Sequence, residues 1–119
     1  MVLTAILQKP EVKSVLVIEK CQDVLDLVAS HVPAHGKRLG VVCSDILEWK
    51  PPEGQLWDTI YLDIWPTICG DNARVMSKLR KKFSPRLNSR NQRAWIGCWS
   101  EHRVKAWKRK AWGRVLDAR

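Results

Sequence analysis

The sequence predicts an α/β layered fold, with a mostly parallel sheet of about four strands and helices on both faces. Three observations predict it. Short β-branched or apolar runs alternate along the chain with segments whose apolar residues recur every three or four positions. The helical segments between strands suit parallel crossovers. Three successive strands also end in an acidic residue. At 119 residues we expect a single domain.

The alternation can be followed along the chain. Apolar residues at helical spacing predict helices over residues 2–9, 22–32, 73–83 and 101–116. Apolar runs predict strands over residues 12–18, 39–43, 58–64 and 94–99. The first strand is rich in β-branched residues, which is typical of burial on both faces of a parallel sheet. Asp71 and Asn72 are expected to cap the third helix.

The charge of the chain is unevenly distributed. Its net charge is +9, but residues 1–73 hold six Lys or Arg against ten Asp or Glu, whereas residues 74–119 hold fifteen against two. Four Trp lie among these basic residues, and together they offer phosphate attraction and stacking faces, as in single-stranded nucleic-acid binders. The alternative is that the Trp pack on the sheet and the charges only solvate its outer face. The helix over residues 73–83 is expected to expose a basic face made of Arg74, Lys78, Arg80, Lys81 and Lys82. The expected nucleic-acid contacts are Arg74, Lys78, Lys81, Arg103, Lys108 and Arg109.

Composition and residue spacing argue against a membrane span, a secretory signal and a metal site. No apolar run approaches the ~20 residues of a membrane span, and the first residues lack the basic start of a secretory signal, so we expect a cytoplasmic protein. The four Cys are widely spread along the chain, and no two of them have the short spacing of a metal-binding pair. This predicts reduced thiols, several of them buried. The three His do not cluster with them, and we expect no metal site.

The acids at the strand ends form the candidate site. Glu19, Asp45 and Asp63 each follow a predicted strand, and the carboxyl ends of parallel strands meet at one edge of a sheet, where ligands bind. A carboxylate has two acceptor oxygens and so can bind the two adjacent hydroxyl groups of a ribose. The alternative for each acid is a helix cap or a solvated strand end.

These residues carry a resemblance to a known family. The segments 15–20, 43–46 and 58–66 resemble the sequential motifs of class I S-adenosylmethionine-dependent methyltransferases, with similarity to the spermidine synthase branch. The resemblance implies an incomplete Rossmann-like layered fold. It implies that Glu19, with Lys20, holds the cofactor ribose and that Asp45 and Ile46 contact the adenine. It further implies that Asp63 lies beside the reacting centre, above a pocket shaped by Ile64, Trp65 and Pro66.

One part of the family pattern is missing. Its most diagnostic motif is a glycine-rich turn after the first strand, and Met1 here lies inside what resembles the following helix. We therefore expect an N-terminally truncated domain in which the strands of Glu19 and Asp63 lose the neighbour between them. Their edges would then stay unpaired, which favours self-association, or pair directly.

Two functions follow as hypotheses. The first is a methyltransferase-like protein that binds S-adenosylmethionine, with Asp63 orienting or deprotonating the methyl acceptor. The second is a non-catalytic nucleic-acid-binding module that uses the basic, Trp-containing C-terminal half. A nicotinamide-dinucleotide protein would also use Glu19, but the chain lacks the glycine fingerprint of that class.

Overall fold

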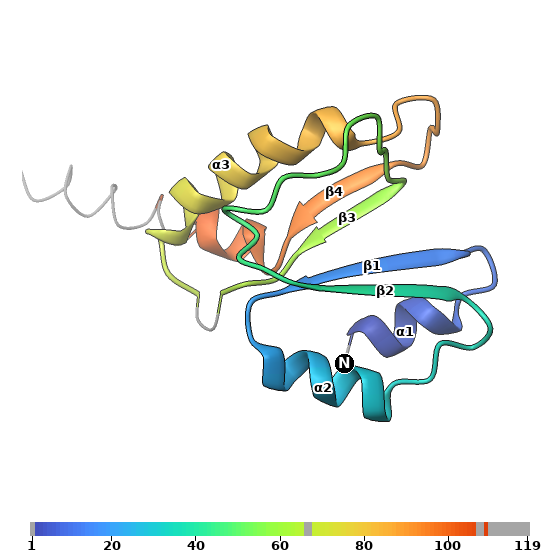
Figure 1. The fold of residues 1–119 in the computed structure, drawn as a ribbon. Coiled ribbons are helices and arrows are strands. Elements are labelled where there is room, and N and C mark those ends of the chain that lie inside the picture. Colours follow the sequence, from blue (N-terminus) through green and yellow to red (C-terminus); the bar gives the residue numbers. More distant parts are fainter. Residues whose placement is uncertain (1, 66–67, 107–108, 110–119) are drawn as a thin grey trace, which may run out of the picture. The chain divides into compact units, whose positions relative to one another are not determined.

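The computed structural model describes residues 2–65, 68–106 and 109, and it has the α/β character that the sequence predicts (Figure 1). Its contacts divide the chain into two compact units, Met1–Lys50 and Pro51–Arg119, called unit 1 and unit 2 below. Among the described residues, no helix is long and apolar enough to cross a membrane.

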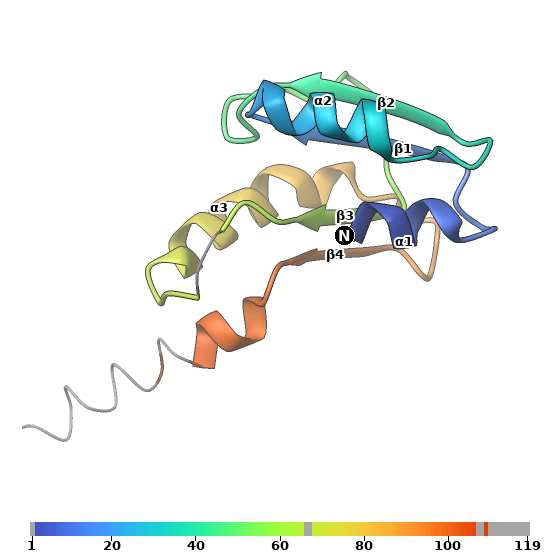
Figure 2. The same ribbon diagram turned by 90° about the horizontal axis from the view of Figure 1, so that it is seen from below.

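Unit 1 contains two helices and two strands. In chain order these are α1 (Val2–Gln8), β1 (Ser14–Glu19), α2 (Gln22–His31) and β2 (Arg38–Cys43). The strands are parallel, with Ser14 opposite Arg38 and Glu19 opposite Cys43. Figures 1 and 2 show α2 lying along this two-stranded sheet.

The core of unit 1 lies on one face of its sheet. Leu3 and Leu7 of α1 and Val28 of α2 are buried together, and they pack against partly buried residues of both strands and of the chain after α2: Val15, Val17, Val32 and Leu39. Leu16 points to the other face and remains 37% exposed. The predicted burial of the first strand on both faces is therefore wrong, because both helices of the unit cover the same face.

Unit 2 also contains a β–α–β segment. Its elements are β3 (Thr59–Leu62), α3 (Asn72–Phe83), the short 3₁₀ helix η1 (Ser84–Arg86) and β4 (Trp95–Cys98). The two strands are parallel, with Thr59 opposite Trp95 and Leu62 opposite Cys98. Met76, Leu79 and Phe83 form the buried stripe of α3, as their helical spacing predicts.

The end of unit 2 is described only in part. Residues 101–106 and 109 are helical, and Val104 is fully buried. The rest of the predicted helix over 101–116 lies outside the described residues. The predicted cap of α3 is not made by Asp71, which occupies the N-cap position without a side-chain hydrogen bond to the helix.

The strand arrangement differs from the predicted sheet of about four strands. Within the described residues there are two sheets of two strands each, β1–β2 and β3–β4. Each pair is joined by its own crossover helix, whereas residues 44–58 between β2 and β3 contain no helix. Neither β1 nor β3 has a second strand neighbour in the described part of the chain. Of the two predicted outcomes, unpaired edges or direct pairing of these strands, the structure has the unpaired edges.

Candidate functional site

The acids after β1 and β2 lie at one edge of one sheet. Glu19 is the last residue of β1 and pairs with Cys43, the last residue of β2, and Asp45 follows two residues later. The ladder continues past the strands, because the Ser44 N–H donates to the Glu19 carbonyl at 2.9 Å. The structure therefore brings Glu19 and Asp45 to the carboxyl edge of the β1–β2 sheet, as predicted.

Local backbone groups orient both carboxylates. Glu19 Oε1 accepts from the Cys21 N–H at 3.0 Å, and Asp45 Oδ1 accepts from the Leu47 N–H at 2.9 Å. Both side chains belong to half-buried residues. The second oxygen of each, Oε2 and Oδ2, has no hydrogen-bond partner among the described residues. Each acid thus combines the turn-stabilising role of the alternative interpretation with one acceptor left for a ligand.

The neighbours of these acids complete the edge. Lys20 is exposed, and its carbonyl accepts a weak hydrogen bond from the Cys43 thiol at 3.5 Å, which links the ends of β1 and β2. Ile46 is half-buried in the turn after β2, where the Glu48 and Trp49 N–H groups both donate to the Asp45 carbonyl. The edge therefore offers two acceptor oxygens, a lysine and an apolar side chain.

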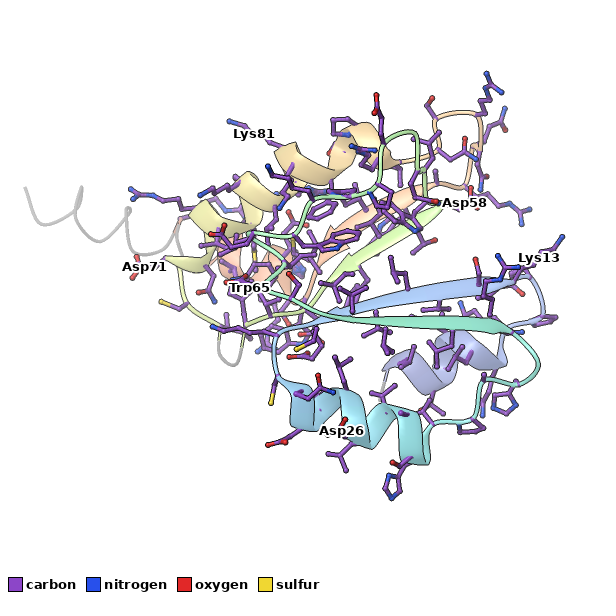
Figure 3. All side chains as sticks on the ribbon, in the orientation of Figure 1. Lys13, Asp26, Asp58, Trp65, Asp71 and Lys81 are labelled. Atoms are coloured by element: carbon purple, nitrogen blue, oxygen red, sulfur yellow. The ribbon has the colours of Figure 1, made fainter. Side chains whose placement is uncertain are left out.

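The third predicted acid, Asp63, follows a strand of the other sheet, so the prediction that all three acids share one sheet edge is wrong. Asp63 follows β3 and is exposed, and its negative charge raises the pKa of Tyr61, after the larger effect of desolvation by burial. Ile64 beside it is 45% exposed, whereas Trp65, labelled in Figure 3, is only 8% exposed and belongs to the packed residues. Pro66 lies outside the described residues.

An aromatic pair on the β3–β4 sheet was not singled out from the sequence. The ring of Tyr61 stacks on that of Trp95 with centroids 6.2 Å apart and planes 18° apart, and Trp95 is still 49% exposed. The Trp95 indole also lies over Gly97, where a Cβ atom would collide with the ring. Tyr61 is opposite Gly97 in the ladder, so the indole fills the place that a side chain at Gly97 would take.

The loop before β4 is held by one acid at the start of β3. Asp58 Oδ1 accepts from the side-chain amides of Asn88 at 3.0 Å and Asn91 at 3.1 Å. The Arg90 N–H donates to Asn88 Oδ1 at 3.3 Å and the Arg93 N–H to Asn91 Oδ1 at 2.9 Å. Figure 3 labels Asp58 beside this loop. Residues 88–93 are therefore a tandem Asn-x-Arg loop, in which each asparagine links Asp58 to the arginine two residues on.

The sequence held a signal for this loop. Residues 88–93 read Asn-Ser-Arg-Asn-Gln-Arg, so the spacing Asn-x-Arg occurs twice in succession. Their hydrogen bonds lower the pKa of Asp58 below its ordinary value, with Asn91 the larger cause and Asn88 the second. The lowered pKa favours the ionised form of Asp58. Arg90 and Arg93 are both exposed, and neither has an ion-pair partner among the described residues.

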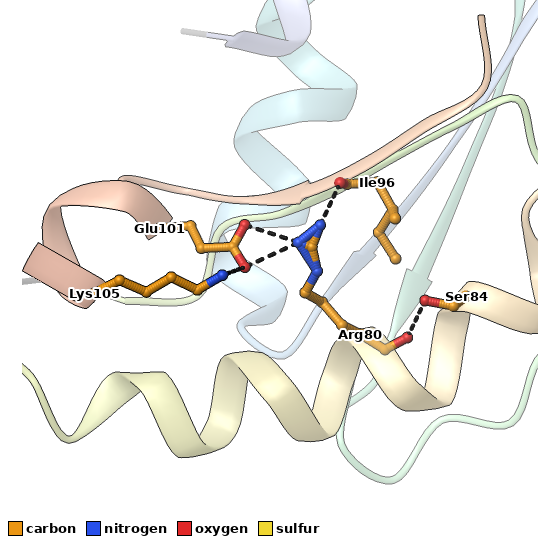
Figure 4. A network of polar contacts seen from close by, with 5 residues as sticks. All are labelled: Arg80, Ser84, Ile96, Glu101 and Lys105. Atoms are coloured by element: carbon orange, nitrogen blue, oxygen red, sulfur yellow. Dashed lines mark hydrogen bonds and ion pairs between the residues drawn. The ribbon is translucent and has the colours of Figure 1, made fainter.

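Arg80 has a different position from the one predicted. The sequence places it on the exposed basic face of α3, but one of its nitrogens contacts both Glu101 oxygens, at 2.9 and 3.0 Å (Figure 4). Its other terminal nitrogen donates to the Ile96 carbonyl at 3.1 Å. Lys105 adds a weaker ion pair to Glu101 at 3.4 Å. Arg80 therefore joins α3 to β4 and to the helical residues that follow, and the prediction that it is a solvated charge is wrong.

The predicted nucleic-acid contacts can be located except for one. Arg74, Lys78 and Lys81 are exposed on α3, and Arg103 and Arg109 are exposed in the C-terminal helical residues. None of these five is in an ion pair within the described part of the chain. Lys108 lies outside the described residues.

The four cysteines are free thiols. Only Cys98 is buried, so the expectation that several are buried is wrong. Desolvation raises the pKa of the Cys98 thiol to about 11, with Glu101 adding to the rise while Arg80 and Lys105 oppose it. Among the described residues, no group of three His, Cys, Asp or Glu side chains is placed to hold a metal ion.

Comparison of the chain with protein-family models, with curated proteins and with solved structures found no match.

Proposed function

We propose that the chain is a methyltransferase-like protein that binds the nucleoside part of S-adenosylmethionine at the carboxyl edge of β1 and β2. The observation that carries this proposal is the pair of half-buried acids, Glu19 and Asp45, each with one oxygen fixed by the backbone and one without a partner among the described residues. A free carboxylate oxygen accepts from a ribose hydroxyl or from the adenine amino group.

The strand pairing is compatible with the same proposal. In doubly wound sheets of this type the strand order is 3-2-1-4-5, in which strands 3 and 2 are neighbours and strands 4 and 5 are neighbours. The chain has two parallel pairs, each with its own crossover helix. In the resemblance β1 and β2 correspond to the second and third strands, and β3 and β4 to the fourth and fifth.

The described residues fit one part of the cofactor better than the other. Glu19 and Asp45 supply acceptors for the ribose and the adenine, and the Ile46 side chain supplies an apolar contact for the base. We therefore expect adenosine alone to retain most of the affinity.

Calorimetry on the full chain tests the proposal with S-adenosylhomocysteine, adenosine and methionine as ligands. Glu19→Gln keeps an acceptor for the Cys21 N–H but loses the charge, and should weaken S-adenosylhomocysteine about 10-fold or more, as expected for hydrogen bonds to charged groups. Glu11→Gln, an exposed change just before the opposite end of β1, is the control and should stay within about twofold. Absence of binding heat, or equal affinities of the two variants, would overturn the proposal.

A further inference from the structure

The exposed aromatic and the tandem Asn-x-Arg loop meet at the start of β4. The Trp95 N–H donates to the Asp58 carbonyl at 3.0 Å, and the carboxylate of the same Asp58 holds Asn88 and Asn91. The loop is also fixed on its other side, because the Trp57 N–H donates to the Arg86 carbonyl and the Asn88 N–H to the Trp57 carbonyl, both at 2.8 Å. Backbone bonds and side-chain bonds therefore set the loop beside the aromatic residue.

The two parts of this surface offer complementary chemistry. Trp95 is 49% exposed although Tyr61 stacks on it, so an indole is held in place with much of its surface open. Two arginines, Arg90 and Arg93, are exposed on a loop whose turns are closed by Asn88 and Asn91. A flat aromatic group stacks on a nucleobase, and guanidinium groups bind phosphate oxygens.

We propose that this surface binds single-stranded nucleic acid, with a base stacked on Trp95 and backbone phosphates bound by Arg90 and Arg93. Charge favours this occupant, since residues 51–119 hold fifteen Lys or Arg against six Asp or Glu, whereas residues 1–50 hold six of each. Asp58 is the acid that contacts the loop, and its carboxylate is bound by the two asparagine amides. A single strand exposes base faces for stacking, whereas a duplex does not.

The site is independent of the proposed cofactor site. It uses residues of unit 2 only, and the two proposals can fail separately. It also differs from the contacts predicted on α3 and on the C-terminal residues, because Arg90 and Arg93 lie on the loop between η1 and β4.

Fluorescence anisotropy of the full chain with a labelled oligothymidylate tests the role of Trp95. Trp95→Leu should weaken binding about 5- to 150-fold, the range expected when one base stacking interaction is removed. Trp95→Phe keeps an aromatic face and should restore most of the affinity. Circular dichroism checks that each variant is folded. Equal losses in Trp95→Leu and Trp95→Phe, or a preference for duplex DNA of the same sequence, would overturn the proposal.

The salt dependence of the same binding tests the two arginines. The double change Arg90→Gln and Arg93→Gln should reduce the slope of log K against log salt by about 1.4, that is about 0.7 for each phosphate of a single strand that an arginine no longer neutralises. The matched control is Lys13→Gln with Arg38→Gln in unit 1, which removes the same charge from exposed residues. An equal loss of affinity and of slope in the control would show unspecific attraction and overturn the site.

Discussion

Residues 1–50 and 51–119 each build a two-stranded parallel sheet from one β–α–β segment, but they differ in charge and in what their sheets present. In unit 1 the charges balance, and the acids Glu19 and Asp45 are bound by backbone groups two residues away. In unit 2 the basic residues dominate, and Asp58 is bound by side chains 30 and 33 residues away. The same β–α–β arrangement therefore presents hydrogen-bond acceptors, the two carboxylates, in unit 1. In unit 2 it presents hydrogen-bond donors, the arginines, beside an exposed aromatic residue.

The largest expected effect concerns the two cores. Leu7 of α1 and Leu79 of α3 are both fully buried, so truncation of either to alanine should cost about 2–5 kcal/mol of stability. Because Leu7 packs in the core cluster of unit 1 and Leu79 belongs to the buried stripe of α3 in unit 2, Leu7→Ala should speed amide hydrogen exchange in β1 and β2, and Leu79→Ala in β3 and β4. Exchange measured by mass spectrometry on the full chain checks this. Faster exchange in the opposite unit after either change would break the comparison.

A smaller effect concerns the polar contacts of Arg80. Arg80→Gln should lower the free energy of unfolding by about 1–2 kcal/mol, because Glu101 and the Ile96 carbonyl lose their charged donor. This value is modest because the Arg80 side chain is 34% exposed. Denaturant titration measures the change.

The control for Arg80 is Lys81→Gln, the same kind of change at an exposed residue of the same helix, which should have almost no effect. Equal stabilities of the two variants would contradict the bridging role of Arg80.

The smallest expected effect concerns Asp58 and sharpens the comparison most. Asp58→Ala removes a negative charge next to a basic loop, so simple electrostatics predict tighter oligothymidylate binding. We expect binding about threefold weaker instead, the size of one hydrogen bond's contribution, because Asn88 and Asn91 lose their common acceptor. Anisotropy at fixed salt decides between the two signs, and tighter binding would contradict the positioning role of Asp58.

The pH dependence of the same carboxyl group provides a second check. Hydrogen bonds lower the pKa of Asp58 in the folded state from its ordinary 3.8, so its stabilising effect is complete above that value and is lost as the pH falls through the lowered pKa. Carbon NMR of the Asp58 carboxyl should show a midpoint below 3.8, which Asn88→Ala with Asn91→Ala should bring back toward it. An unchanged midpoint in that variant would count against the asparagine bonds.

Much of the secondary structure could be predicted from spacing. The β-branched run around Val15 and Val17 indicated a strand, and the stripe of Met76, Leu79 and Phe83 indicated a helix with one buried face. Arg80 was misplaced although it lies four residues after Met76 and so shares the buried side. Its partner Glu101 is 21 residues away, and no local pattern predicts a contact at that separation.

In the candidate sites, too, the sequence did not predict contacts between residues that are far apart in the chain. The sequence predicted that Glu19, Asp45 and Asp63 share a sheet edge, because parallel strand ends meet there. This is confirmed for Glu19 and Asp45 but wrong for Asp63, whose strand belongs to the other sheet. The sequence did not predict two separate sheets, since apolar runs reveal strands but not which strands pair. The repeated Asn-x-Arg spacing is visible in the sequence. The hydrogen bonds that hold the loop depend on Asp58, which only the fold brings beside Asn88 and Asn91.

One measurement tests the division between the two units most directly, namely amide chemical-shift mapping of the ¹⁵N-labelled full chain with each ligand in turn. With S-adenosylhomocysteine we expect the shifts to concentrate at Glu19, Lys20, Asp45 and Ile46. With oligothymidylate we expect them to concentrate in residues 88–97. Shifts from both ligands on the same residues, or no shifts at the β1–β2 edge with S-adenosylhomocysteine, would contradict the assignment of the cofactor to unit 1 and of nucleic acid to unit 2.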